Sequence, residues 1–240
     1  MEPAAAPRVT ALIVVDVQHD YVDPAGALPC PGAPAILAPI NRALAALPFP
    51  GGIYYSEDDK LPSDAFGAFP PHCLLGSRGH DKPEGLALSA AAGHVRIPKR
   101  SSLSAFGDGP EATPLRALLA AAGASHAVVC GLALELCVLE TAAHCVALGL
   151  RTAVVREASR AYDPGSPRCT QALPRRLAEL ASSGCCAWWT RLRRRWSGAS
   201  GGAAGGGGIS SEGRRDSEAH AQAWTAAART GVLLHISLSC

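Results

Sequence analysis

Short apolar runs rich in β-branched residues alternate along the chain with longer stretches of alanine and leucine. This alternation is typical of parallel strands that are joined by crossover helices. The apolar runs predict strands at 10–16, 52–56, 94–97, 126–131 and 151–156. The Ala- and Leu-rich stretches predict helices at 33–47, 113–123, 137–149 and 170–183. Two of these helices end at Gly123 and Gly149, where a left-handed cap is expected.

Elements in this order predict one α/β domain over residues 1–190, built as a doubly wound, Rossmann-like parallel sheet with helices on both faces. Ligands of such sheets bind at the carboxyl ends of the strands. After residue 190 the composition changes, and glycine and serine dominate. Such a segment cannot offset its ordering entropy by burial, so residues 191–240 are predicted to be a flexible, low-complexity tail. For its last stretch, TGVLLHISLSC, a short strand is the alternative.

Composition and charge narrow the class of protein. The chain has 240 residues, of which 48% are hydrophobic and 18% charged, enough for one full core. Its net charge is +2, and the basic excess lies in 191–240, so no nucleic-acid surface is predicted. Nine cysteines without a CxxC pair indicate a reduced, cytoplasmic protein. The sequence has no apolar run typical of a signal peptide or membrane span, so no membrane partner is expected.

One cysteine stands at the start of a predicted helix. The segment VVCGLALELCVLETAAHCVALG places Cys137 after a buried strand and a tight turn, where an Ala-rich helix begins. A thiol there faces the positive end of the helix dipole and unpaired backbone N–H groups, which favour its thiolate and an oxyanion beside it. A free cysteine is equally often a small buried hydrophobic residue. Its neighbours must therefore decide between a nucleophile and a core residue.

Two charged residues follow strands to the same edge of the predicted sheet. Asp16 comes directly after the run ALIVV, and Lys99 follows the strand at 94–97. An aspartate there also forms caps and turns, and a lysine is usually solvated. A lysine beside a thiol would lower the thiol pKa and keep an aspartate charged. Together with Cys137 they supply the base, cation and thiol that hydrolyse an amide through an acyl-enzyme, so we interpret them as a catalytic triad.

Three segments resemble one known family. ALIVVDVQHDYVD resembles the opening of the nicotinamidase and isochorismatase-like hydrolases, PPHCLLGSRG their His-Cys-Gly segment, and GLALELCVLETA their nucleophile turn. The resemblance runs from about Ala11 to Leu180 in the order of the family. It implies that Asp16 is the general base, Lys99 its electrostatic partner and Cys137 the nucleophile.

The same resemblance implies further residues of the site. A cis peptide is expected just before Ala133, and the N–H groups of Ala133 and Cys137 are expected to form the oxyanion hole. Tyr21 and Phe69 match aromatic positions that wall the substrate ring. Leu103 stands near a position where nicotinamidases carry a tyrosine beside the substrate.

One segment departs from the family pattern. Nicotinamidases hold a divalent metal with a D-x-H motif, a second histidine soon after it, and the histidine of the PHC segment. Asp58 and His72 match ligands, but Lys60 stands at the first histidine, and Asp64 or Ala65 at the second. An ammonium cannot bind a cation, so no cofactor is expected, and a zinc, iron or manganese site would be incomplete. Lys60 is expected instead to donate a hydrogen bond to the substrate ring.

These residues predict an amidase that converts nicotinamide to nicotinate and ammonia through a cysteine thioester. Two alternatives stay open. One is a metal-independent cysteine hydrolase of the same superfamily with another substrate, such as an N-carbamoyl compound. The other is a non-catalytic binding protein with a decayed site. The expected partner is a small-molecule amide, and the formation of a homo-oligomer is left open.

The composition of the tail leads to a first prediction. Deleting residues 197–240 should change the melting temperature by no more than about 2 °C, because a Gly-rich segment buries little apolar surface. Circular dichroism of the truncated and full chains measures the difference. A larger fall would show that the stretch TGVLLHISLSC docks on the domain.

Overall fold

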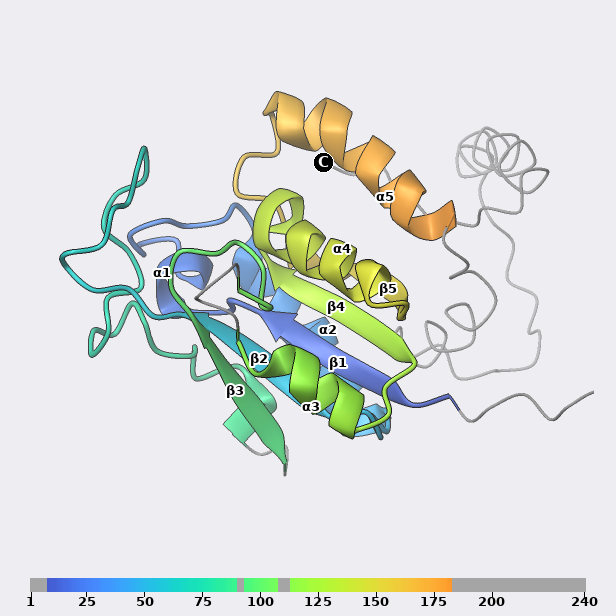
Figure 1. Cartoon of the computed structure of the whole chain (residues 1–240). Helices are drawn as coiled ribbons and strands as arrows, with labels where there is room; N and C mark the ends of the chain where they lie inside the picture. Colours follow the sequence, from blue (N-terminus) through green and yellow to red (C-terminus); the bar gives the residue numbers. More distant parts are fainter. Residues whose placement is uncertain (1–7, 90–92, 108–112, 183–240) are drawn as a thin grey trace, which may run out of the picture.

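A five-stranded parallel sheet forms the centre of the fold (Figure 1). The structure is a computed structural model that describes residues 8–89, 93–107 and 113–182. The strands lie in the order β3-β2-β1-β4-β5, and each neighbouring pair is parallel. They are β1 (Thr10–Val15), β2 (Ile53–Asp58), β3 (His94–Lys99), β4 (His126–Leu132) and β5 (Arg151–Arg160).

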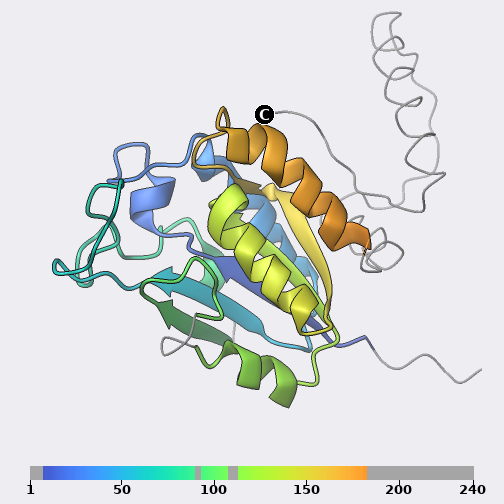
Figure 2. The same ribbon diagram turned by 45° about the horizontal axis from the view of Figure 1, so that its top comes forward.

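Helices cover both faces of this sheet, as Figure 1 and Figure 2 show. On one face α2 packs together with the 3-10 turn η1, and on the other face lie α3, α4 and α5. The predicted doubly wound α/β fold is confirmed. The helices and turns on the two faces are η1 (Ala33–Ile36), α2 (Leu37–Ala46), α3 (Leu115–Ala121), α4 (Leu139–Ala147) and α5 (Leu173–Ser182).

The central strand β1 is apolar from Ala11 to Val15 because it is buried on both faces. All of its residues, Thr10–Val15, are buried. Leu12 and Val14 belong to the core beneath α2. Ile13 and Val15 belong to the core beneath α3 and α4. A strand of this kind has no solvent face, which is why its sequence is a continuous apolar run.

Two strands run further than the apolar pattern predicts, β2 to Asp58 and β3 to Lys99. These two residues are register partners, and Lys99 Nζ lies 2.5 Å from Asp58 Oδ1. The sheet therefore continues into charged residues because their side chains pair. The strand β5 likewise extends beyond the predicted end at 156, after a register shift in its pairing with β4.

The helices begin and end differently from the prediction. The chain forms a π-helical turn, η4 (Leu134–Val138), and α4 begins only at Leu139. The expectation that Cys137 is the first residue of the helix is therefore wrong, because the residue lies inside this turn. A short helix, α1 (His19–Val22), was not predicted. The predicted left-handed caps are confirmed, with φ of +61° at Gly123 and +79° at Gly149.

Some predictions fall beyond the described ranges. The tail at 191–240 and the domain boundary at residue 190 both lie outside them. Within residues 8–89, 93–107 and 113–182, none of the helices has the length and hydropathy that a bilayer span requires.

Gly131 allows β1 and β4 to approach closely next to the carboxyl edge of the sheet. Its φ is +117°, which side chains rarely allow, and an added Cβ would lie 2.1 Å from the Val15 carbonyl oxygen. Glycine is therefore required at this position both by the backbone conformation and by the space available.

Replacing Gly131 with alanine should lower the free energy of unfolding by about 3 kcal/mol or more, because the backbone of β1 or β4 must shift. Gly149→Ala is the matched control, since its φ is also positive but an added Cβ meets nothing within 4 Å. The control should cost only about 1 kcal/mol of conformational strain. Urea unfolding measures both losses. Equal losses would contradict the close approach described here.

Candidate active site

The ends of three strands bring Asp16, Lys99 and Cys137 to one point on the carboxyl edge of the sheet. Asp16 follows β1, Lys99 ends β3, and Cys137 lies in η4, just after β4. Lys99 Nζ is 2.9 Å from Asp16 Oδ2 and 3.8 Å from Cys137 Sγ. All three residues are buried, and Asp16 has no exposed surface. The structure thus brings together the three residues that strand order predicted to meet.

Asp16 is fixed by contacts with β2. Its φ of +51° is left-handed, a conformation that aspartate adopts more readily than most residues. Its N–H donates to the Ser56 carbonyl at 3.1 Å, and its Oδ1 accepts from Ser56 Oγ at 2.7 Å. Oδ2 lies 2.9 Å from Lys99 Nζ, and Asp16 also lies within hydrogen-bond reach of the Cys137 thiol. The carboxylate is therefore placed to accept the proton of the Cys137 thiol.

Burial and neighbouring charges set the protonation of the two charged groups. Burial raises the pKa of Asp16 to about 6, with Lys99 lowering it and Asp58 raising it. For Lys99, burial lowers the pKa, but Asp16 and Asp58 outweigh this and raise it well above its usual value. Lys99 Nζ also donates to the Ser102 carbonyl at 3.2 Å. The lysine is thus charged, while the aspartate has a pKa in the range useful to a general base.

The thiol of Cys137 behaves differently from the prediction. Burial raises its pKa well above the usual value, and Lys99, which lowers it, is outweighed. The nearby carboxylates of Asp16 and Asp58 raise the thiol pKa further. The expectation of a favoured thiolate is therefore wrong, because desolvation exceeds the effect of one ammonium group. A neutral thiol faces a carboxylate that can take its proton.

Ala133 connects β4 to the turn that carries Cys137. The peptide bond between Leu132 and Ala133 is cis, as the family resemblance implies. The Ala133 carbonyl accepts from the N–H groups of Leu136 at 3.1 Å and Val138 at 3.2 Å. N–H groups at the start of such a turn are the ones that have no partner within a helix.

A cavity of about 190 Å³ opens beside these residues, with much of its wall aromatic. An apolar cavity of about 150 Å³ holds one benzene ring, so this cavity accommodates a single substituted ring. Of the predicted site residues, Asp16 alone does not line it; it is fully buried and pairs with Lys99, which does. The predicted residues in the wall are Tyr21, Asp58, Lys60, Phe69, His72, Lys99, Leu103, Ala133 and Cys137.

Asp58, Lys60 and His72 lie in the wall of this cavity, but they do not fit a metal ion. Asp58 accepts from Lys99 Nζ through Oδ1 and from the Tyr21 hydroxyl through Oδ2, each at 2.5 Å. Lys60 Nζ, 3.8 Å from Asp58 Oδ1, adds a second positive charge there. Burial raises the pKa of Asp58, but Lys99 and Lys60 outweigh it and lower the pKa. A divalent ion would meet an occupied carboxylate and a repelling ammonium.

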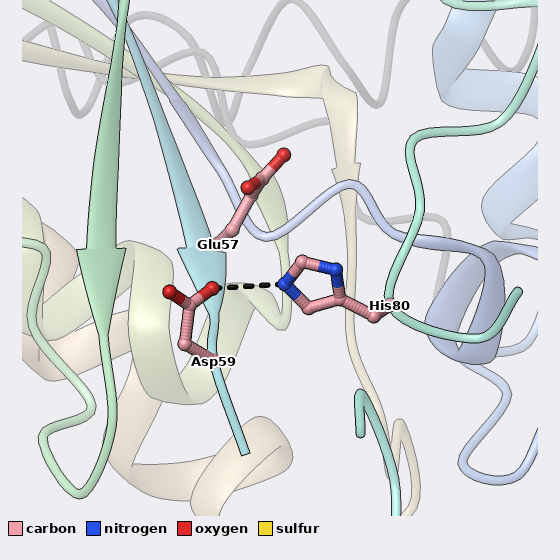
Figure 3. A group of neighbouring side chains, drawn as sticks. All are labelled: Glu57, Asp59 and His80. Carbon is pink, nitrogen blue, oxygen red and sulfur yellow. Dashed lines mark hydrogen bonds and ion pairs between the residues drawn. The ribbon is translucent and has the colours of Figure 1, made fainter. Parts of the chain in front are cut away.

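A second polar cluster lies at the end of β2, and the sequence did not predict it (Figure 3). Glu57, Asp59 and His80 each offer a ligand atom within 4.8 Å of the others, and His80 Nε2 lies 2.8 Å from Asp59 Oδ1. Arg96 bonds to both carboxylates, and Lys82 Nζ lies 3.4 Å from Glu57 Oε1. A metal ion would have to displace these cations. The expectation that the protein needs no metal stays a prediction.

Three other residues shape the site and were missed. Gln18 is fully buried, accepts from the Asp58 N–H at 2.8 Å and donates to the Asp58 carbonyl at 3.2 Å. Glu135 accepts from backbone N–H groups of the loop after β5, where Tyr162 lines the cavity. Gln18 stands in the segment ALIVVDVQHDYVD, which could have drawn attention to it. No local pattern marks Tyr162.

Comparison with known proteins identifies the family. Residues 10–177, more than half of the chain, match the isochorismatase domain family. The chain belongs to the isochorismatase family. It is similar to the nicotinamidase/pyrazinamidase of Mycobacterium tuberculosis, with 32% sequence identity over 155 residues. The matched region covers 60% of this chain and 83% of that protein.

Two solved structures share the fold of this isochorismatase-family chain. PnC1 from L. infantum in complex with nicotinate is 29% identical, with a TM-score of 0.64 over 73% of this chain and 90% of that one. The pyrazinamidase of Pyrococcus horikoshii in complex with zinc is also 29% identical, with a TM-score of 0.59 over 73% and 96%. The predicted resemblance is confirmed, and these relatives support an amidase of the isochorismatase family.

Proposed function

We propose that the protein is a cysteine amidase that hydrolyses nicotinamide to nicotinate and ammonia. The observation that carries this proposal is the contact of Asp16, Lys99 and Cys137 beside a cavity the size of one ring. The sequence similarity to a nicotinamidase/pyrazinamidase supports the choice of a ring amide. The described cysteines are all free thiols, which supports a reduced, cytoplasmic setting.

In the proposed acylation, Asp16 accepts the proton of the Cys137 thiol as the sulfur attacks the amide carbon. The carbonyl oxygen gains the negative charge, and the N–H groups of Ala133 and Cys137 hold it. Each such donor typically lowers the barrier by about 3 kcal/mol. Lys99 stays charged and stabilises the thiolate as it forms. Asp16 then returns the proton to the amide nitrogen, and the C–N bond breaks to release ammonia.

Deacylation repeats the same proton transfers with water. Asp16 accepts a proton from water as its oxygen attacks the thioester carbon, and the same N–H groups hold the oxyanion. The C–S bond breaks, and Asp16 returns the proton to the Cys137 sulfur, so the acid product leaves and the thiol is restored. One base therefore serves both half-reactions.

Lys60 is proposed to bind the ring nitrogen of the substrate. An ammonium has three donors, and the Lys60 Nζ bonds to the Arg100 carbonyl and faces Asp58 Oδ1. The third donor is left for a ligand in the cavity that Lys60 lines. Tyr21 and Phe69 are proposed to flank the ring, with Leu103 at the exposed rim. The alternatives are a small amide of another kind as substrate and a binding role without turnover. An ammonia-release assay decides between them.

Replacing the nucleophile tests the proposal directly. Cys137→Ser should lower ammonia release from nicotinamide by roughly a thousandfold or more, because serine is nearly isosteric but a much poorer nucleophile with this base. Cys169→Ser is the control, since that buried cysteine does not line the cavity and should retain activity. Full activity in Cys137→Ser would place the nucleophile elsewhere.

The protonation of Asp16 should set the acid limb of the pH profile. Since burial raises the pKa of Asp16 to about 6, kcat/KM should fall about tenfold per pH unit below that value, as the carboxyl becomes protonated and can accept no proton. The hydrogen bond from Ser56 lowers this pKa, so Ser56→Ala should move the limb to higher pH. An acid limb that stays in place in Ser56→Ala would mean that another group titrates.

The charge of Lys60 should make the enzyme insensitive to chelators. EDTA should leave ammonia release from nicotinamide unchanged, because the cavity offers no adequate ligand set. Lys60→His made together with Ala65→His, both positions lining the cavity, should bind about one zinc per chain and become EDTA-sensitive. Arg116→His, at an exposed position of α3 that does not line the cavity, is the control. Stoichiometric metal in the wild-type protein, removed by EDTA with loss of activity, would refute this account.

A further inference from the structure

A contact between two loops closes one side of the cavity. Phe69 comes from the loop between β2 and β3, and Tyr162 from the loop after β5. Their rings meet edge to face, with centroids 5.5 Å apart at an interplanar angle of 80°. Both rings line the cavity, and Phe69 is 38% exposed, so the contact lies at its rim. Edge-to-face pairs of this geometry are attractive beyond the area that they bury.

The loop that carries Tyr162 is held by a buried carboxylate in the turn of Cys137. Glu135 is 6% exposed, and it receives the Tyr162 N–H at Oε2 (3.2 Å) and the Asp163 N–H at Oε1 (2.9 Å). Hydrogen bonds to a charged acceptor are stronger than those between neutral groups. Within the loop, Ser166 Oγ donates to the Asp163 carbonyl at 2.8 Å. The Glu135 side chain thereby joins the turn that carries Cys137 to the loop that carries Tyr162.

We propose that Tyr162 is a specificity-determining residue that, with Phe69, selects a planar ring, and that Glu135 is the positioning residue that holds it there. The inference rests on the proposed function for the reaction, and it deepens that function by assigning the ring recognition. Glu135 acts through Tyr162 and not on the reacting atoms. The turn of Cys137 has backbone bonds of its own to the Ala133 carbonyl, and these do not involve the Glu135 side chain.

This division of roles makes a kinetic prediction. Tyr162→Ala should raise KM for nicotinamide about tenfold and leave kcat within about twofold, because ring contacts are made equally in the ground state and the transition state. Glu135→Ala should raise KM by a similar factor, because the loop is released. Glu135→Gln, which keeps one acceptor oxygen, should fall between Glu135→Ala and the wild type.

A double-mutant cycle tests whether Glu135 acts through Tyr162 or stabilises the site independently of it. Residues that act through one contact are non-additive, so the variant with both Glu135→Ala and Tyr162→Ala should show a KM increase of about tenfold and not a hundredfold. Glu140→Ala is the matched control, because this acid on α4 pairs with Arg176 at 2.6 Å and does not line the cavity. Additive effects, or a fall in kcat at constant KM, would overturn the assignment of Glu135.

Two further measurements keep the inference testable on its own. If Glu135→Ala fails to fold, the cycle between Phe69→Ala and Tyr162→Ala tests the ring contact instead, and additive effects there would overturn it. Equilibrium dialysis with nicotinate measures ring binding without turnover. Wild-type binding that Tyr162→Ala weakens, in a protein that releases no ammonia, would end the proposed amidase and support the role of Tyr162. Absence of nicotinate binding in the wild type would overturn the ring assignment.

Discussion

One ammonium group, Lys99 Nζ, pairs with two buried carboxylates and so ties together the ends of three strands. Asp16 follows β1, Asp58 ends β2, and Lys99 ends β3, with separations of 2.9 and 2.5 Å. Buried charges persist in a protein only when they are paired. This pairing extends β2 and β3 to their charged last residues, occupies Oδ1 of Asp58 and puts the ammonium 3.8 Å from the thiol of Cys137. The same ion pairs therefore set the electrostatics of the site and hold the edge of the sheet together.

The sheet and the triad were predictable because each follows from short segments of sequence. A buried apolar strand such as β1 must deliver the polar residue after it to the edge, and parallel strands deliver several such residues to the same edge. Gln18, Glu135 and Tyr162 were not predictable in this way. Glu135, for example, binds residues 27 and 28 positions later in the chain. Contacts of that range depend on how loops return to the site, which local periodicity does not encode.

For the thiol of Cys137, reasoning from the local sequence predicts a pKa shift in the wrong direction. A cysteine at the start of a helix is expected to be acidic, because the helix dipole and a nearby lysine favour the thiolate. Here the π-helical turn places Cys137 before α4, in a buried environment with Asp16 and Asp58 close by. Desolvation and these carboxylates exceed the attraction of Lys99. The thiol is therefore neutral, and the carboxylate of Asp16 can accept its proton. Catalysis consequently requires a proton transfer from Cys137 to Asp16 inside the site.

The left-handed backbone of Asp16, with φ of +51°, limits what can replace it. Glycine and asparagine accept this conformation but offer no charge, and glutamate carries the charge on a longer side chain that disfavours the conformation. Aspartate alone among the common amino acids meets both demands. A substitution that keeps the conformation therefore removes the charge that pairs with the buried Lys99, and one that keeps the charge disfavours the conformation, so position 16 has no tolerated neighbour in sequence space.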